Sequence, residues 1–130
     1  MLDLARVRKG EKLVDMGSGD GAIIIAAGKR GLEAHGFEIS PFLVWKTKQN
    51  IRKAGLEGKV FVHWTDMWKA SVKDTDVVTV FAITWVMKKM GAKLLRELPK
   101  GSRVVTETFK FPNWKVVEER DKVFLYIKLR

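Results

Sequence analysis

Residues 13–21 read LVDMGSGDG, an apolar strand that runs into a glycine-rich turn with carboxylates at its edge and inside it. Glycine suits this turn because a tight strand-to-helix connection needs backbone angles, or a close approach, that a Cβ atom forbids. The helix that follows, from Ala22, directs its free amide groups into the gap at the end of the strand. The segment therefore predicts an α/β unit that holds a nucleoside-bearing cofactor at the turn.

The spacing of the glycines fits two classes of cofactor. Residues 17–22, GSGDGA, match the dinucleotide pattern G-x-G-x-x-G/A and also the G-x-G-x-G pattern of methyl-donor sites. A pyrophosphate would lie against Asp20 and Asp15, and such a like-charge contact in a partly desolvated site is unfavourable. S-adenosylmethionine has no phosphate and carries a sulfonium and an ammonium group, which carboxylates favour. The charges therefore predict S-adenosylmethionine.

A second acidic residue supports a nucleoside site without deciding between the two classes. Glu38 lies about twenty residues beyond the turn, at the end of the next predicted strand, where a carboxylate can accept both ribose hydroxyls. The alternative is a turn of purely structural value, with Glu38 solvated at the end of its strand.

Length and composition limit the chemistry of the chain. Its 130 residues predict one domain, 1–130, in which any substrate binds on the cofactor domain itself. The absence of cysteine excludes disulfides, thiolate metal sites and cysteine nucleophiles. His35 and His63 are too few for a histidine metal cluster and are expected to be satisfied residues of the core or of a strand edge. We therefore expect no metal site.

The formal charge of +10, from 25 basic and 15 acidic residues, favours an acidic partner. Three explanations of this positive charge remain open: binding to nucleic acid, binding to an acidic protein surface, or a heat-adapted surface that needs no partner. The lysines and arginines of the predicted helices are spread around each helix, which favours solvated helix faces over a nucleic-acid footprint. No apolar run approaches membrane-spanning length and the amino terminus lacks the pattern of a secretory signal, so we expect a cytoplasmic protein.

Strand and helix signals alternate along the chain, which predicts an α/β fold. Strands are expected at 12–16, 33–39, 59–64, 76–83 and 102–109. Helices are expected at 2–7, 22–29, 41–55 and 86–98. The third helix starts at Pro41 and ends at Gly55, with Ala54 on its apolar face. Segments 116–120 and 122–129 alternate as an antiparallel hairpin. Five parallel strands closed by a carboxyl-terminal antiparallel hairpin form the Rossmann-like sheet of class I methyltransferases.

Several longer segments together resemble one family. FEISPFLV at 37–44, DMWK at 66–69, LLRELP at 94–99, and RVV at 103–105 followed by FPNW at 111–114 look like the seven-strand protein-lysine methyltransferases. That family includes archaeal broad-specificity enzymes and those acting on the adenine nucleotide translocase and the ATP synthase c-subunit. Its members usually carry Arg after the glycine loop, where this chain has Ala22, and a Pro-Thr-Pro segment before the first helix, which this sequence does not contain.

The resemblance implies transfer of a methyl group from S-adenosylmethionine to lysine side chains of a protein substrate. The pocket must disfavour the ammonium, whose ordinary pKa is about 10.4, and aromatic walls do so by excluding water. The residues expected at the methyl transfer are Phe81, Thr84, Trp85 and Trp114. The expected cofactor-binding residues are Asp15, Gly17, Ser18, Gly19, Asp20, Gly21, Glu38, Ile39, Asp66, Met67 and Phe81, with Asp66 on the adenine amine.

Other readings remain open at this stage. Phe81, Trp85 and Trp114 could be core residues, and Asp66 could be a solvated loop acid. An RNA methyltransferase would use the positive charge, but residues 81–85, FAITW, lack the Pro-Pro-aromatic loop of enzymes that methylate amino groups of adenine or glutamine. A non-catalytic S-adenosylmethionine-binding protein is the third possibility.

Overall fold

The computed structural model describes residues 1–81, 84–112 and 114–129. Seven strands form one sheet in the order β3-β2-β1-β4-β5-β7-β6. The strands are β1 (Lys12–Met16), β2 (Glu33–Glu38), β3 (Val60–Trp64), β4 (Val77–Val80), β5 (Arg103–Glu107), β6 (Glu118–Arg120) and β7 (Val123–Ile127). The first five run parallel and β7 pairs antiparallel with both β5 and β6, so the predicted sheet is confirmed.

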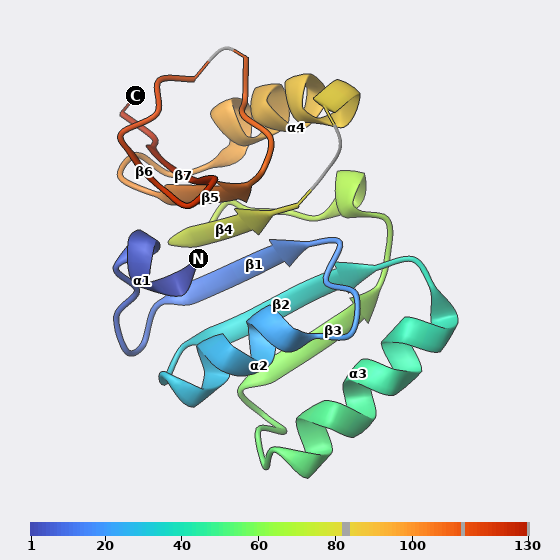
Figure 1. The fold of residues 1–130 in the computed structure, drawn as a ribbon. Coiled ribbons are helices and arrows are strands. Elements are labelled where there is room, and N and C mark those ends of the chain that lie inside the picture. Colours follow the sequence, from blue (N-terminus) through green and yellow to red (C-terminus); the bar gives the residue numbers. More distant parts are fainter. Residues whose placement is uncertain (82–83, 113, 130) are drawn as a thin grey trace.

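The helices cover both faces of this sheet (Figure 1). They are α1 (Leu2–Ala5), α2 (Ala22–Lys29), α3 (Pro41–Lys53) and α4 (Thr84–Glu97), with a short 3₁₀ turn, η1 (Met67–Lys69), after β3. Apolar residues of α1, α2 and α3 pack in one core cluster, and those of α4 pack in a second cluster with residues that follow η1. The sheet thus separates two cores, as in a doubly wound fold.

Local signals placed both ends of α2 and the starts of α1 and α3 correctly. Ser40 caps α3 by accepting a hydrogen bond from the backbone N–H of Leu43 at 3.3 Å, and Pro41 starts the helix. Other bounds were wrong in detail: α3 ends at Lys53 with Ala54 exposed, and β4 ends at Val80. α1 ends at Ala5 rather than at residue 7, and α4 spans Thr84–Glu97 rather than 86–98. The last predicted residues of that strand, 82–83, lie outside the described residues.

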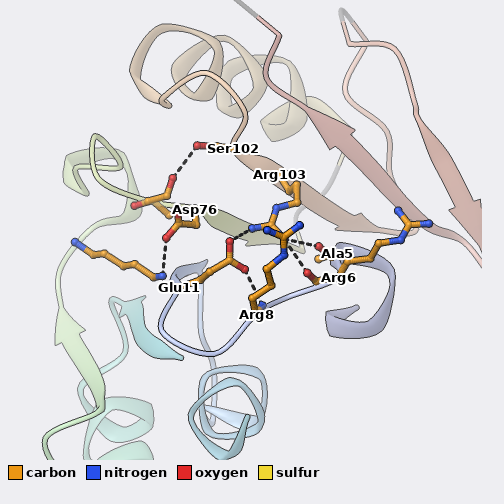
Figure 2. A network of polar contacts seen from close by, with 9 residues as sticks. Ala5, Arg6, Arg8, Glu11, Asp76, Ser102 and Arg103 are labelled. Atoms are coloured by element: carbon orange, nitrogen blue, oxygen red, sulfur yellow. Dashed lines mark hydrogen bonds and ion pairs between the residues drawn. The ribbon is translucent and has the colours of Figure 1, made fainter. Parts of the chain in front are cut away.

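A polar network closes the edge of the sheet at which the parallel strands begin (Figure 2). The guanidinium of Arg103 donates to the carbonyls of Ala5 and Arg6, each at 2.9 Å, and forms an ion pair with Glu11. Glu11 also accepts from the backbone N–H of Arg8 at 2.7 Å. The side chain of Arg103 is mostly buried, so this network fastens α1 and the chain that follows it to β5.

Two further contacts complete this closed edge. Asp76 accepts from the backbone N–H of Lys12 at 2.9 Å, and the Ser102 hydroxyl donates to the carbonyl of Thr75 at 2.7 Å. They join the beginnings of β1, β4 and β5, so the amino-terminal edge is held by side-chain bonds as well as by the strand ladders.

Candidate functional site

The site begins at the glycine loop between β1 and α2, at the carboxyl-terminal edge of the sheet. Gly17, Gly19 and Gly21 have φ angles of 75°, 56° and 86°, the left-handed region that other residues rarely adopt. The backbone N–H groups of Gly17 and Ser18 both donate to the carbonyl of Phe37, at 3.0 and 3.1 Å. The loop is thereby tied to the end of β2.

Glu38 holds the other side of the loop. One of its carboxylate oxygens accepts from the backbone N–H of Gly19 at 2.8 Å, and the other accepts from the backbone N–H of Ser40 at 3.0 Å. The side chain is half-buried and reaches the cavity next to the loop. A carboxylate so placed at the end of β2 is positioned to accept hydroxyl donors, as the sequence predicts.

Asp66 lies across the cavity from the glycine loop, after β3. It caps η1 by accepting from the backbone N–H of Trp68 at 2.9 Å, and its side chain is exposed. The cavity between these elements measures about 340 Å³ and is lined by Gly17, Phe37, Glu38, Ile39, Asp66, Met67 and Trp68. Five of these seven are predicted cofactor residues, so the structure brings the three predicted segments together.

Two lining residues, Phe37 and Trp68, are absent from the predicted set. Trp68 follows Asp66 closely in the sequence, so the predicted adenine contact could have identified it. The ammonium nitrogen of Lys89, on α4, lies over the Trp68 ring, 4.5 Å from the ring centroid. This cation–π contact links η1 to α4 beside the cavity.

Asp15 lies beneath the glycine loop, inside the sheet. Its side chain is almost fully buried, and one carboxyl oxygen accepts the hydroxyl of Thr79, its neighbour on β4, at 2.7 Å. Burial raises the pKa of Asp15 to about 7, the nearby Glu38 charge adds to the increase, and the Thr79 hydrogen bond opposes it. A bound cation would favour the ionised form of this carboxyl group.

The remaining predicted loop residues, Ser18, Asp20 and Gly21, differ in burial and in hydrogen bonding. Ser18 is buried, with its hydroxyl close to where a Cβ on Gly36 would lie, and no protein partner is found for that hydroxyl. Asp20 is exposed and accepts from the backbone N–H of Ala22 at 3.2 Å. Gly21 is the N-cap residue of α2, and a Cβ there would lie 2.5 Å from a methyl carbon of Thr47.

The residues predicted at the methyl transfer divide into two groups. Phe81, directly after β4, and Trp85, in the first turn of α4, are 58% and 75% exposed, so neither is a core residue. Thr84 begins α4, and its side chain lies outside the described part of the structure. Trp114 instead packs against the core: its indole N–H donates to the carbonyl of Gly91 at 3.3 Å, and its ring meets Tyr126 edge-on. The pairing of Trp85 with Trp114 across an acceptor channel stays a prediction.

The two histidines form a separate pair on β2 and β3. Nδ1 of His35 and Nε2 of His63 are 2.9 Å apart, and Nε2 of His35 is 2.8 Å from a carboxylate oxygen of Glu33. Burial lowers the pKa of His63, and the charges of His35 and two nearby lysines lower it further. In the part of the chain that the structure describes, no group of three potential ligands could hold a metal ion.

Comparison with known proteins identifies the family of this chain. The ANTKMT methyltransferase domain matches residues 15–118. The adenine nucleotide translocase lysine N-methyltransferase of Mus musculus is 41% identical over 131 residues, which cover 97% of this chain and 57% of that protein. A protein-lysine N-methyltransferase of Saccharolobus islandicus is 32% identical over 137 residues, covering 98% of this chain and 85% of that protein.

A solved structure is also similar to this chain over nearly its whole length. An RNA methyltransferase from Salinibacter ruber, in complex with S-adenosyl-L-homocysteine, superimposes with a TM-score of 0.93 at 32% identity, covering 98% of this chain and 87% of that one. The chain spans about half the length of the first curated relatives it matches, 57% and 48%. The matched domain model covers the glycine loop and every residue that lines the cavity, and the chain therefore belongs to the ANTKMT methyltransferase domain family.

Proposed function

We propose that this chain is an S-adenosylmethionine-dependent methyltransferase that acts on lysine side chains of proteins. The cavity between the glycine loop, β2 and η1 is the observation that supports S-adenosylmethionine as the methyl donor. Two carboxylates, from Glu38 and Asp66, line it, and no lysine or arginine is among its described lining residues. Its volume of about 340 Å³ lies within the range of small-molecule sites, roughly 300–1,000 Å³.

The charges of the cavity favour a cationic nucleoside over a dinucleotide. Burial gives Asp15 a pKa of about 7, so a nearby cation is favourable there and a pyrophosphate is not. In this proposal Glu38 accepts the ribose hydroxyls, Asp66 accepts the adenine amine, and Ile39 and Met67 pack against the ring. Bound S-adenosylmethionine supplies the methyl group from a sulfonium.

The chain's own task at the acceptor is to expose a neutral amine. Phe81 and Trp85 follow β4, next to β1 in the sheet, so they lie on the same edge as the glycine loop. Their rings would exclude water from an entering lysine side chain, which disfavours the ammonium and releases its proton to solvent. The names of the mouse and archaeal relatives support lysine as the acceptor.

RNA is the second candidate acceptor, because one specific observation favours it. The Salinibacter ruber protein, described as an RNA methyltransferase, covers nearly this whole chain, and the net charge of +10 suits an acidic substrate.

The cytoplasmic location expected from the sequence remains a proposal, which cell fractionation would test.

One experiment separates these acceptors. The chain is incubated with methyl-labelled S-adenosylmethionine and either total protein or total RNA, and the products are digested with ribonuclease or hydrolysed in acid. We expect ribonuclease-resistant label that is recovered as methyllysine, and transfer that increases with pH as more amine becomes neutral. Label that ribonuclease releases would instead establish RNA as the acceptor. Donor binding without transfer to either would show a non-catalytic protein.

A further inference from the structure

Large apolar side chains are exposed along the carboxyl-terminal edge of the sheet. Six of them lie at or after the carboxyl-terminal ends of β2, β3 and β4, and we call them the apolar rim: Ile39, Phe42, Trp45, Trp64, Phe81 and Trp85. Their exposed fractions run from 56% for Trp45 to 75% for Trp85. Scattered single apolar residues are ordinary on a protein surface, but a group of this size on one edge indicates an interaction site.

The apolar rim lies on the same edge of the sheet as the candidate cofactor cavity and meets it at Ile39. Ile39 lines that cavity, and the indole N–H of Trp64 donates to its carbonyl at 2.9 Å. The rings of Phe42 and Trp45, on the first turns of α3, lie 6.1 Å apart. Because β2, β3 and β4 are parallel and share a sheet with β1, the residues that follow them meet at one edge (Figure 1).

Exposed lysines are interleaved with the apolar rim. Lys46 lies one helical turn beyond Phe42 on α3, and Lys88 and Lys89 lie one turn beyond Trp85 on α4. The carboxylates nearest to the mouth are partly engaged, since both oxygens of Glu38 and one of Asp66 accept backbone N–H groups. α3 contains no acidic residue and α4 contains none before Glu97, so the charged side chains that these two helices place beside the rim are basic.

The sign of that charge argues against the acceptor itself as the partner of the rim. Under the proposed function, on which this step rests, the acceptor is a lysine, and Lys46, Lys88 and Lys89 repel a basic segment that would cover the rim. Tryptophan and lysine together are typical of proteins that lie on anionic bilayers, where indoles sit at the headgroup level and ammonium groups meet lipid phosphates.

We propose that the apolar rim and its lysines form a docking surface for an anionic lipid bilayer. The contact is peripheral: among the described residues, no helix has the length and apolar character needed to cross a membrane. Docking in this orientation holds the mouth of the cofactor cavity against the headgroup layer.

The test uses the full chain with two kinds of vesicle. One is phosphatidylcholine alone, and the other is three parts phosphatidylcholine to one part phosphatidylglycerol. Binding is measured by co-sedimentation and by quenching of intrinsic tryptophan fluorescence with brominated lipid. The chain has five tryptophans, and the rim contains Trp45, Trp64 and Trp85. We expect quenching and co-sedimentation with the anionic vesicles, and much weaker binding to neutral vesicles and at high salt.

Variants locate the surface. Phe42→Ser with Trp45→Ser should weaken binding about tenfold, and Lys46→Glu should weaken it at least about fivefold. The matched control is Val117→Ser with Leu129→Ser, which removes exposed apolar residues that line a different cavity, beside α4 and β7. The control should bind vesicles as the wild type does. None of these positions lines the candidate cofactor cavity, so donor affinity measured by calorimetry should stay unchanged in all of them.

The proposal is overturned by equal binding to the two vesicles, by no binding to either, or by equal losses in the rim and control variants. If the Phe42 and Trp45 double variant does not fold, Lys46→Glu decides, because its exposed side chain is not part of the core. Methylation of soluble proteins without any binding to vesicles would support the proposed methyltransferase function and overturn the bilayer-docking proposal. Vesicle binding without donor binding would do the reverse.

Discussion

The two edges of the sheet use their polar groups in opposite ways. At the amino-terminal edge, Arg103, Glu11 and Asp76 each bond to other parts of the chain (Figure 2). At the carboxyl-terminal edge, Glu38 accepts from the backbone N–H groups of Gly19 and Ser40, and Asp66 accepts from that of Trp68, beside an open cavity. Indole and phenyl rings on this edge are exposed. The polar groups of the first edge are closed off by contacts within the chain, whereas the carboxylates of the second edge also line a cavity that a ligand can enter.

The largest effect is expected at the closed edge. Arg103→Leu leaves the carbonyls of Ala5 and Arg6 and the carboxylate of Glu11 without their partner, and should lower the free energy of unfolding by about 3–5 kcal/mol. Urea denaturation measures it. The control is Arg30→Leu, which breaks an exposed ion pair with Asp3 and should cost under about 1 kcal/mol. Similar losses in both variants would remove the contrast between the edges.

Asp15, beneath the glycine loop, should make the free energy of unfolding depend on pH. Its pKa of about 7 in the fold lies above the unfolded value of 3.8, so the folded state binds the extra proton and stability falls as pH rises from about 4 to about 7. The loss is up to about 4 kcal/mol, and it is complete above pH 7. His63, whose pKa is lowered, acts oppositely: its contribution is present above pH 6.5 and is lost as pH falls below that value.

Asp15→Asn isolates this effect. The amide oxygen can still accept the Thr79 hydroxyl, so the variant should lose the decline in stability while keeping the contribution of His63. Urea denaturation of both proteins at pH 5 and pH 8 measures the difference. A wild type and a variant with parallel pH profiles would show that Asp15 is ionised in the fold at neutral pH.

Glu38 should matter more for the ligand than for the fold. Glu38→Ala removes a carboxylate from the cavity and should weaken S-adenosylmethionine binding about tenfold to a hundredfold, or about 1.5–3 kcal/mol. Glu57→Ala, at an exposed glutamate 3.9 Å from Arg52, is the control and should bind normally. Calorimetry compares the three proteins. Unchanged affinity in the Glu38 variant, or tighter binding of a nicotinamide dinucleotide, contradicts the donor assignment.

The smallest effect on stability is expected at Trp85. Trp85→Leu alters a side chain that is 75% exposed and should change the free energy of unfolding by less than about 0.5 kcal/mol while lowering methyl transfer. Trp114→Leu breaks packing against Tyr126 and should cost about 1–2 kcal/mol. Melting temperature and turnover are measured side by side. If turnover follows stability in both variants, neither ring belongs to an acceptor channel.

The sequence by itself determined the first strand, the glycine loop and the helix after it. The predicted bounds 12–16 and 22–29 agree with β1 and α2, because positive φ angles at Gly17, Gly19 and Gly21 are requirements of the local backbone. The Ser40 cap and Pro41 placed the start of α3 for the same reason. The order of strands and helices then predicted the parallel sheet and its antiparallel end.

Only the tertiary structure decided which side chains are buried, exposed or paired. Asp15 is buried because it faces Thr79 of β4, and the His35–His63 pair joins two strands. In the sequence, Phe81, Trp85 and Trp114 are all large apolar residues, yet among these three only Trp114 packs against the core. Arg103 reaches carbonyls near the other end of the chain. Contacts between distant segments depend on how whole elements pack, and no local pattern encodes that packing.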